Sequence, residues 1–151
     1  NVANVVPPYE EDSGESTYHG TSAAVEFAIN HLRVEHIIIM GHSGCGGIGS
    51  LMDHTVTDET EGYSFIRPWM KIVEEAAEFS ELERVSMSNR SRTCVCEKRA
   101  ILISLNNLAS FPWVKDALLE GKLKLHGWYF DIKSGNLSEY NWQKERFEEI
   151  T

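Results

Sequence analysis

HIIIMGHSGCGG, residues 36–47, joins a continuous apolar segment to a loop that is rich in glycine. An uninterrupted β-branched run such as residues 37–39 predicts a central strand that is buried on both faces of a parallel sheet. Ligands of open α/β sheets bind beyond the carboxyl ends of the strands, and residues 41–47 follow such an end. We therefore expect these residues to form the functional loop of an α/β fold.

Patterns on either side of this strand predict further elements of a single α/β domain over residues 1–151. We expect a mostly parallel central sheet flanked by helices, with a C-terminal hairpin. The strand, helix and strand of the first forty residues form a βαβ unit with a right-handed crossover. The expected elements are a strand over 1–6, a helix capped by Thr21 or Ser22, a helix beginning at Pro68, helices over 93–110 and 114–119, and hairpin strands over 122–126 and 137–142.

The expected central strand needs a hydrogen-bonded neighbour on each side, and the sequence offers few candidates. A fold that opens directly on strand-forming residues at Asn1 also lacks a lead-in. We therefore expect the domain to be N-terminally incomplete, without its first strand and its N-terminal helix.

Composition excludes two classes of partner. The net charge of −9 argues against nucleic acid, which is bound by clustered Lys and Arg. No apolar run approaches the roughly 20 residues that cross a bilayer, so we expect no membrane partner. Three cysteines at irregular spacing do not form the pattern of a disulfide framework, which favours a reducing, cytoplasmic location.

His42 and Cys45 are the candidate metal ligands of the loop. Imidazole nitrogen and cysteine thiolate are usual zinc ligands, with bond lengths of about 2.0–2.1 and 2.3 Å. The three-residue spacing lets a tight turn aim both side chains at one point, and the surrounding glycines permit that turn. A His-x-x-Cys pair alone is only moderately specific, because both residues can also be packed in a small-residue turn without a metal.

Two other interpretations of the loop are weaker. Residues 44–49 match the G-x-G-x-x-G pattern of dinucleotide-binding loops, but the polar stretch over 55–62 stands where a second strand should follow. The loop also begins like the G-x-S-x-G nucleophile elbow, yet Cys45 occupies the position that the strained turn reserves for glycine. Asp131 and His126 are the residues left as partners for such a nucleophile.

The loop and three other segments resemble the β-class carbonic anhydrases, in the same order along almost the whole chain. Residues 36–47 resemble the zinc strand and loop of that family, and NVANVVPP at the N-terminus resembles its N-A-N strand. Residues 21–28 resemble the helix before the zinc strand, and GKLKLHGW over 121–128 resembles the late G-x-L-x-L-H-G strand. Several segments in the correct order are far more specific than any one of them.

The resemblance implies a zinc enzyme that hydrates carbon dioxide reversibly to bicarbonate and a proton. It implies that His42 and Cys45 bind Zn2+, and that a zinc-bound hydroxide attacks CO2 because the metal lowers the pKa of its bound water. The position of Gly46 beside Cys45 suggests that its backbone lines the substrate pocket. The family also implies a homodimer or higher homo-oligomer with the active site near the subunit interface.

The same resemblance shows what the sequence lacks. The third zinc ligand of the family and its catalytic Asp/Arg pair lie in a Cys-x-Asp-Ser-Arg segment upstream of the N-A-N strand, and no residue of this chain matches them. No catalytic residue is therefore identifiable in this chain, and Cys94 and Cys96 are weak substitutes as ligands. Two functions remain open: a carbonic anhydrase of which this is the larger piece, and a non-catalytic homologue that acts as a binding or assembly subunit.

Overall fold

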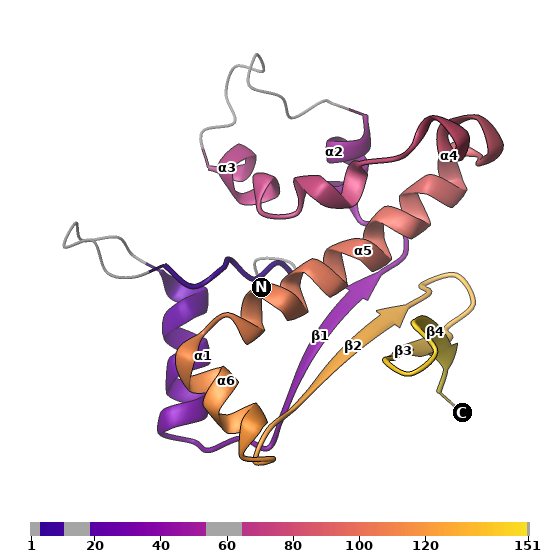
Figure 1. Ribbon diagram of the computed structural model, residues 1–151. Coiled ribbons are helices and arrows are strands. Elements are labelled where there is room, and N and C mark those ends of the chain that lie inside the picture. The colour runs from indigo at the N-terminus through magenta and orange to yellow at the C-terminus, as the bar shows by residue number, and fades with distance from the viewer. Residues whose placement is uncertain (1–3, 11–18, 54–64, 151) are drawn as a thin grey trace.

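The computed structural model describes residues 4–10, 19–53 and 65–150. Their central feature is a four-stranded sheet in the order β1-β2-β3-β4 (Figure 1). The strands are β1 (His36–His42), β2 (Lys124–Phe130), β3 (Leu137–Asn141) and β4 (Arg146–Glu149). β1 and β2 pair in parallel, whereas β2–β3 and β3–β4 pair antiparallel. The α/β fold and the C-terminal hairpin are confirmed, and the parallel part of the described sheet is the β1–β2 pair.

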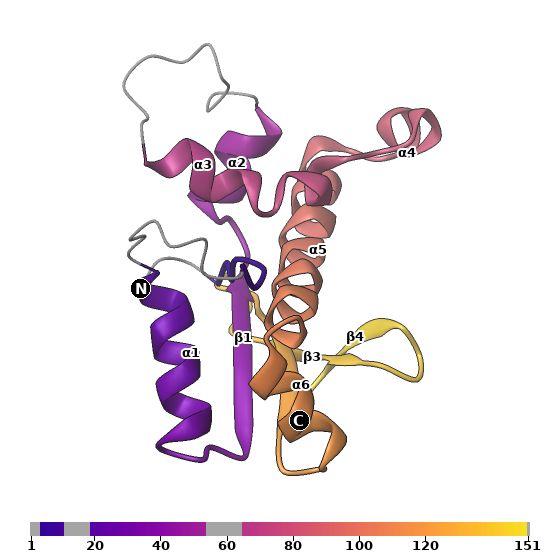
Figure 2. The ribbon, with the colours of Figure 1, turned by 60° about the vertical axis from the view of Figure 1, so that its left-hand side comes forward.

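The described helices leave one face of the parallel pair of strands uncovered. They are α1 (Gly20–Asn30), α2 (Gly46–Met52), α3 (Ile66–Lys71), the 3-10 helix η1 (Glu74–Ala77), α4 (Glu81–Ser86), α5 (Asn89–Ala109) and α6 (Pro112–Leu119). α5 packs against β1 and β2, and α1 stands beside β1 and contacts α6 (Figure 2). In the part of the chain that the structure describes, no helix is both long and apolar enough to span a membrane.

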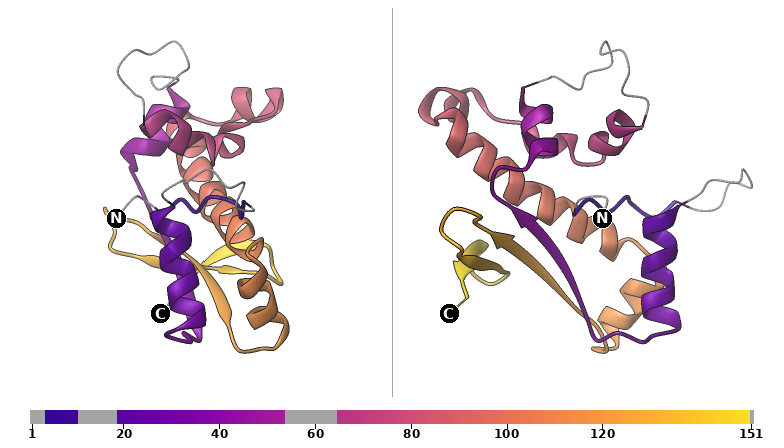
Figure 3. Two further views of the ribbon diagram at one scale, coloured as in Figure 1. Left: turned by 90° about the vertical axis from the view of Figure 1, so that its left-hand side faces the viewer. Right: turned by 180° about the vertical axis from the view of Figure 1, so that it is seen from behind.

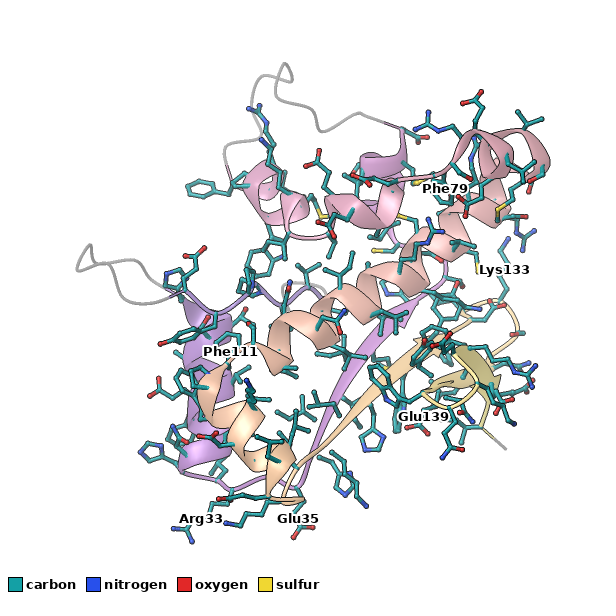
Figure 4. All side chains as sticks on the ribbon, in the orientation of Figure 1. Arg33, Glu35, Phe79, Phe111, Lys133 and Glu139 are labelled. Atoms are coloured by element: carbon teal, nitrogen blue, oxygen red, sulfur yellow. The ribbon has the colours of Figure 1, made fainter. Side chains whose placement is uncertain are left out.

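α5 lies close to the sheet because β2 carries Gly127 at their contact. A Cβ on Gly127 would lie 2.9 Å from Leu105 Cδ1 and 3.1 Å from Ile101 Cγ2, both of which are buried. Where α5 passes into α6, Phe111 is fully buried and lies edge-on to the Tyr9 ring, with ring centroids 5.6 Å apart (Figure 4). One core cluster therefore fills the space between α5, α6 and one face of the sheet, and a second lies between α5 and the segment of α2, α3 and η1.

The N-terminal segment differs from its predicted form. The strand expected over 1–6 is wrong for residues 4–6, which have no strand pairing, while residues 1–3 lie outside the described residues. Side chains of α5 take the place of a neighbouring strand. The Val6 N–H donates to Ser104 Oγ at 3.3 Å, and the Asn107 amide donates to the Val6 carbonyl at 2.8 Å.

Three helix boundaries also differ from those predicted. α1 begins at Gly20, so its first turn already contains Thr21, one of the two residues expected to cap it. The helix expected from Pro68 is split, since α3 ends before the separate 3-10 turn η1. α5 begins four residues earlier than expected, because the Ser88 hydroxyl caps it by accepting a hydrogen bond from the Ser91 N–H.

β1 lies at an edge of the described sheet. Ile39 is 7% exposed on the face that α5 covers, whereas Ile38 and Met40 are 44% and 56% exposed on the opposite face. Seen from behind, no described helix crosses this opposite face of β1 and β2 (Figure 3). The prediction of a strand buried on both faces is therefore wrong for the described chain, because helices pack on only one side of it.

Side chains on the uncovered face connect three strands. His36 Nδ1 and His126 Nε2 are 2.8 Å apart, and His126 Nδ1 lies 2.5 Å from Glu139 Oε1 (Figure 4). This chain of hydrogen bonds links β1, β2 and β3 near the amino end of β1. Both ring nitrogens of His126 therefore have a partner on the sheet face.

Candidate metal centre

The loop that carries the candidate ligands leaves the sheet at the carboxyl end of β1. β1 ends at His42, and the chain then turns into α2, which begins at Gly46. The turn passes through Gly44 with a φ of +74°, a conformation that L side chains rarely adopt. The Ser43 N–H donates to the Phe130 carbonyl at 2.9 Å, which extends the β1–β2 pairing into the loop.

Both candidate ligands lie on this one loop. His42 is exposed, whereas Cys45 is half-buried and packs against the core cluster that contains Ile48 and Cys96. Gly46 lies directly beside Cys45, as the first residue of α2, and is exposed. One imidazole and one thiol on a single turn fit the donor preference of zinc.

Glu97 on α5 anchors the backbone of the loop from the side of the protein core, and it is only 3% exposed. Glu97 Oε1 accepts hydrogen bonds from the Gly44 N–H at 2.7 Å and from the Cys45 N–H at 3.0 Å. Its other oxygen, Oε2, accepts the Tyr129 O–H at 2.7 Å. Burial and this hydrogen bond raise the pKa of the Tyr129 phenol, so Tyr129 remains a donor at neutral pH.

A second anchor joins the loop to the turn between β2 and β3. The Ser43 hydroxyl donates to Asp131 Oδ1 at 3.1 Å and accepts from the Ile132 N–H at 3.0 Å. The Lys133 N–H also donates to Asp131 Oδ1, at 2.9 Å. The bond from Lys133, followed by that from Ser43, holds the pKa of the Asp131 carboxyl below its usual value. The loop is therefore held on two sides by hydrogen bonds within the protein.

A groove of about 1050 Å³ leads along β1 to the loop. We name it the β1 groove. Its walls come from the N-terminal segment, α1, β1 and two tryptophans, and its lining includes Val5, Gly20, Ala24, Ile38, Met40 and His42. The candidate ligand His42 therefore stands at one end of an open, largely apolar channel.

The described residues bring two candidate ligands to the loop and no third one beside them. Among them, no group of three or more His, Cys, Asp or Glu side chains gathers to hold a metal. Cys96 is fully buried, and desolvation, followed by the charge of Glu97, raises the pKa of its thiol to about 11. Cys94 Sγ accepts a long hydrogen bond of 3.6 Å from the Tyr129 O–H. Neither cysteine of α5 joins the pair of His42 and Cys45.

The structure does not favour the two weaker interpretations of the loop. Ser43 does meet Asp131, but the His126 ring bonds to His36 on the sheet face, so these residues do not form a Ser-His-Asp chain. The polar stretch over 55–62 lies outside the described residues, and the next described element after α2 is another helix.

Known proteins similar to this chain identify its family. Over 132 residues, the chain is 39% identical to beta carbonic anhydrase 5, chloroplastic, of Arabidopsis thaliana. The matched region makes up 87% of this chain and 42% of that protein. It is 36% identical over 138 residues to beta carbonic anhydrase 3 of the same plant, covering 89% and 51%. A family model described as carbonic anhydrase matches residues 1–137. This chain belongs to the β-class carbonic anhydrase family.

Solved structures of β-carbonic anhydrases share the fold. The β-carbonic anhydrase CcaA superimposes with a TM-score of 0.82 at 26% identity, covering 97% of this chain and 63% of that one. A tetrameric β-carbonic anhydrase of Sordaria macrospora gives a TM-score of 0.73 at 27% identity, covering 92% and 64%. The chain thus spans about half the length of the curated relatives and under two thirds of these structures.

Neither Glu97 nor Tyr129 of this β-carbonic anhydrase family member was identified from the sequence as a residue of the site. Glu97 is followed by Lys98 and Arg99 on a long helix, where a charged side chain is expected to face solvent, and its backbone partners lie 52 and 53 positions away. The burial of Tyr129 could have been predicted, because it lies two residues from Gly127 and therefore shares the strand face that packs on α5. The Asp131 contact to Ser43 was anticipated only within the nucleophile interpretation.

Proposed function

We propose that the protein to which this chain belongs is a zinc-dependent carbonic anhydrase, which hydrates carbon dioxide reversibly to bicarbonate and a proton. The observation that carries the proposal is the placement of His42 and Cys45 on one anchored loop at the carboxyl end of β1. The family supports CO2 hydration in general, and the donor set supports zinc.

His42 and Cys45 would hold the zinc ion. Zinc, when bound, supplies a Lewis acid that lowers the pKa of water to near 7 from 15.7. The chain's own residues orient this centre, because Glu97 holds the Cys45 backbone and Ser43 ties the loop to the neighbouring turn. A Cβ on Gly46 would meet no atom within 4 Å, so the backbone there borders open space. We assign this backbone to the wall of the substrate pocket.

We further propose that an extended segment upstream of Asn1 completes the centre. A catalytic zinc site needs three protein ligands and an open position. The β1 groove runs beside the edge strand β1 and ends at His42, and its volume is at the upper end of the range for ligand pockets. A segment that adds to this edge in parallel would finish next to the loop, as β1 does. It would deliver the third ligand and the Asp/Arg pair that the family resemblance implies.

The proposal extends to assembly and location. A homodimer or higher homo-oligomer is supported by the tetrameric relative of Sordaria macrospora and by the exposed apolar side chains of Ile38 and Met40. A reducing, cytoplasmic location is supported by three free cysteines, since Cys45 binds metal only as an unoxidised thiolate.

Zinc analysis and stopped-flow CO2 hydration test the proposal on two forms, the chain itself and a form extended upstream through a Cys-x-Asp-Ser-Arg segment. We expect the extended form to hold one zinc per chain and to hydrate CO2 rapidly, and the chain alone to hold less zinc. Cys45→Ser in the extended form should remove most of the zinc and nearly all activity, because a hydroxyl is a poor replacement for a thiolate. Ser104→Ala, at a buried residue of α5 that bonds to the Val6 N–H, is the control and should retain both.

An extended form without zinc would contradict the proposal, as would a Cys45→Ser form that keeps zinc and activity. An extended form that binds zinc fully and does not hydrate CO2 would instead identify a non-catalytic homologue.

A further inference from the structure

Glu97 is a charged residue in a place where charge is costly. It is 3% exposed on the face of α5 that meets the loop, and burying a carboxylate without partners is unfavourable. Three donors surround it: two consecutive loop N–H groups on Oε1 and the Tyr129 O–H on Oε2. Both oxygens only accept, which is the bonding pattern of an ionised carboxylate.

The position of the two N–H donors is set by the turn itself. With Gly44 in the left-handed region, successive backbone N–H groups point toward one side of the loop and form a small anion-binding concavity. Glu97 fills this concavity from inside the protein. The Cys45 side chain is therefore attached to a backbone that is held by a charge-assisted hydrogen bond of 3.0 Å.

Tyr129 fixes the carboxylate in turn. Its hydroxyl reaches Glu97 from β2, the strand paired with β1, so α5, β2 and the loop meet at one carboxylate. Lys98 Nζ lies over the Tyr129 ring, 4.8 Å from the ring centroid. Glu97, Tyr129 and the loop belong to three different parts of the fold, so the position of the loop depends on how α5 packs on the sheet.

We propose that Glu97 is a positioning residue for the metal loop, with Tyr129 as its support, and that together they present Cys45 to the metal in advance of binding. This inference rests on the proposed zinc function, because it assigns the pair a role toward that ion. A hydrophobic residue of similar volume at position 97 would fill the space but remove the carboxylate acceptor of the Gly44 and Cys45 N–H groups.

The experiment measures zinc affinity by competition with a chromophoric chelator. It also records the thiolate-to-metal charge-transfer absorption of the cobalt(II) form, which reports the metal-bound cysteines, Cys45 among them. The variants are Glu97→Ala, Glu97→Gln and Tyr129→Phe, made in whichever of the two forms above binds zinc stoichiometrically. Ser104→Ala is the matched control, because Ser104 is fully buried on the same helix and bonds only to the distant N-terminal segment in the described structure.

We expect Glu97→Ala to weaken zinc binding about 10- to 100-fold, the usual cost of losing a partner that orients a ligand, and to diminish the charge-transfer absorption. Glu97→Gln keeps a carbonyl oxygen for both loop N–H groups, and its amide can donate to the Tyr129 oxygen, so it should fall between Glu97→Ala and the unchanged protein. Tyr129→Phe removes one hydrogen bond and should weaken zinc binding roughly two- to tenfold. Ser104→Ala should lower thermal stability and leave zinc affinity and the cobalt spectrum unchanged.

Glu97→Ala or Tyr129→Phe protein that is folded and binds zinc as tightly as the unchanged protein overturns the inference. Should Glu97→Ala fail to fold, Tyr129→Phe and Glu97→Gln decide the question, since each retains acceptors for the loop. Equal losses of zinc affinity in Ser104→Ala and Glu97→Ala also overturn it, because the effect would then follow general destabilisation. Absence of zinc from the unchanged protein in both forms is a different result, and it counts against the proposed function.

Discussion

Replacing Gly127 with alanine tests how closely α5 must approach the sheet. The new Cβ would lie 2.9 Å from Leu105 Cδ1 and 3.1 Å from Ile101 Cγ2, whereas carbon atoms in contact prefer about 3.5–4.0 Å. One of the partners must therefore move by about 0.5–1 Å, and both are buried, with exposures of 1% and 0%. Overpacking of this kind lowers the free energy of unfolding by about 1–3 kcal/mol. The reduced conformational freedom of the unfolded chain raises it by about 0.4–1 kcal/mol.

We therefore expect Gly127→Ala to lower the free energy of unfolding by about 1–2 kcal/mol, measured by urea denaturation followed by circular dichroism. Gly49→Ala is the control, because a Cβ there meets no atom within 4 Å and the position lies inside α2. It should raise stability by up to about 1 kcal/mol.

Leu105→Val provides a second test, because it removes the Cδ1 atom that the new Cβ approaches. Its cost should be smaller in the Gly127→Ala background than in the unchanged chain. Equal costs in the two backgrounds, or a Gly127→Ala protein at least as stable as the unchanged one, would refute the reasoning from close approach.

Three further outcomes follow from the hydrogen bonds at the surface. The pKa of the Asp131 carboxyl is depressed in the folded state. The stability that this carboxylate contributes is therefore present above the usual carboxyl pKa of about 3.9, and it is lost as pH falls through the lower native value. Ser43→Ala removes one of the hydrogen bonds to Asp131 and should raise its pKa in an NMR titration. Ser80→Ala removes the hydroxyl that caps α4 and should cost about 1 kcal/mol in denaturant unfolding. Arg146→Gln should raise the pKa of Glu148 from about 2, since Arg146 is the first cause of its depression, and an unchanged value by NMR would contradict that assignment.

The parts of the fold that follow local rules were predictable from the sequence. The strand at 36–42 and the loop after it combine a β-branched run with glycines, and both stand where they were expected. The start of α5 was misplaced by four residues, although Ser88 is a usual capping residue that the sequence displays. The apolar periodicity begins only after the first turn of that helix, which is why the expected start was too late.

The features that escaped prediction depend on contacts distant in sequence. Residues 4–6 have the composition of a strand, but α5 side chains bond to their backbone, so their form is decided about 100 positions away. The split between α3 and η1 has no proline or glycine at the break, and burial of Val73 and Ala76 against the core accompanies it. Glu97 is the clearest case, because nothing in its sequence neighbourhood indicates burial, and its partners are backbone groups of the loop and the Tyr129 hydroxyl.

The free edge of β1 has a practical consequence for handling the chain. An exposed edge strand is a template on which other chains can pair, and natural proteins discourage this with charges, proline or short strands. β4 at the opposite edge carries Arg146 and Glu149, whereas β1 is seven residues long and, apart from histidines at its two ends, apolar or glycine. Self-association of the isolated chain should therefore begin at β1 and grow with concentration. A preparation that stays monodisperse would indicate that something already occupies that edge.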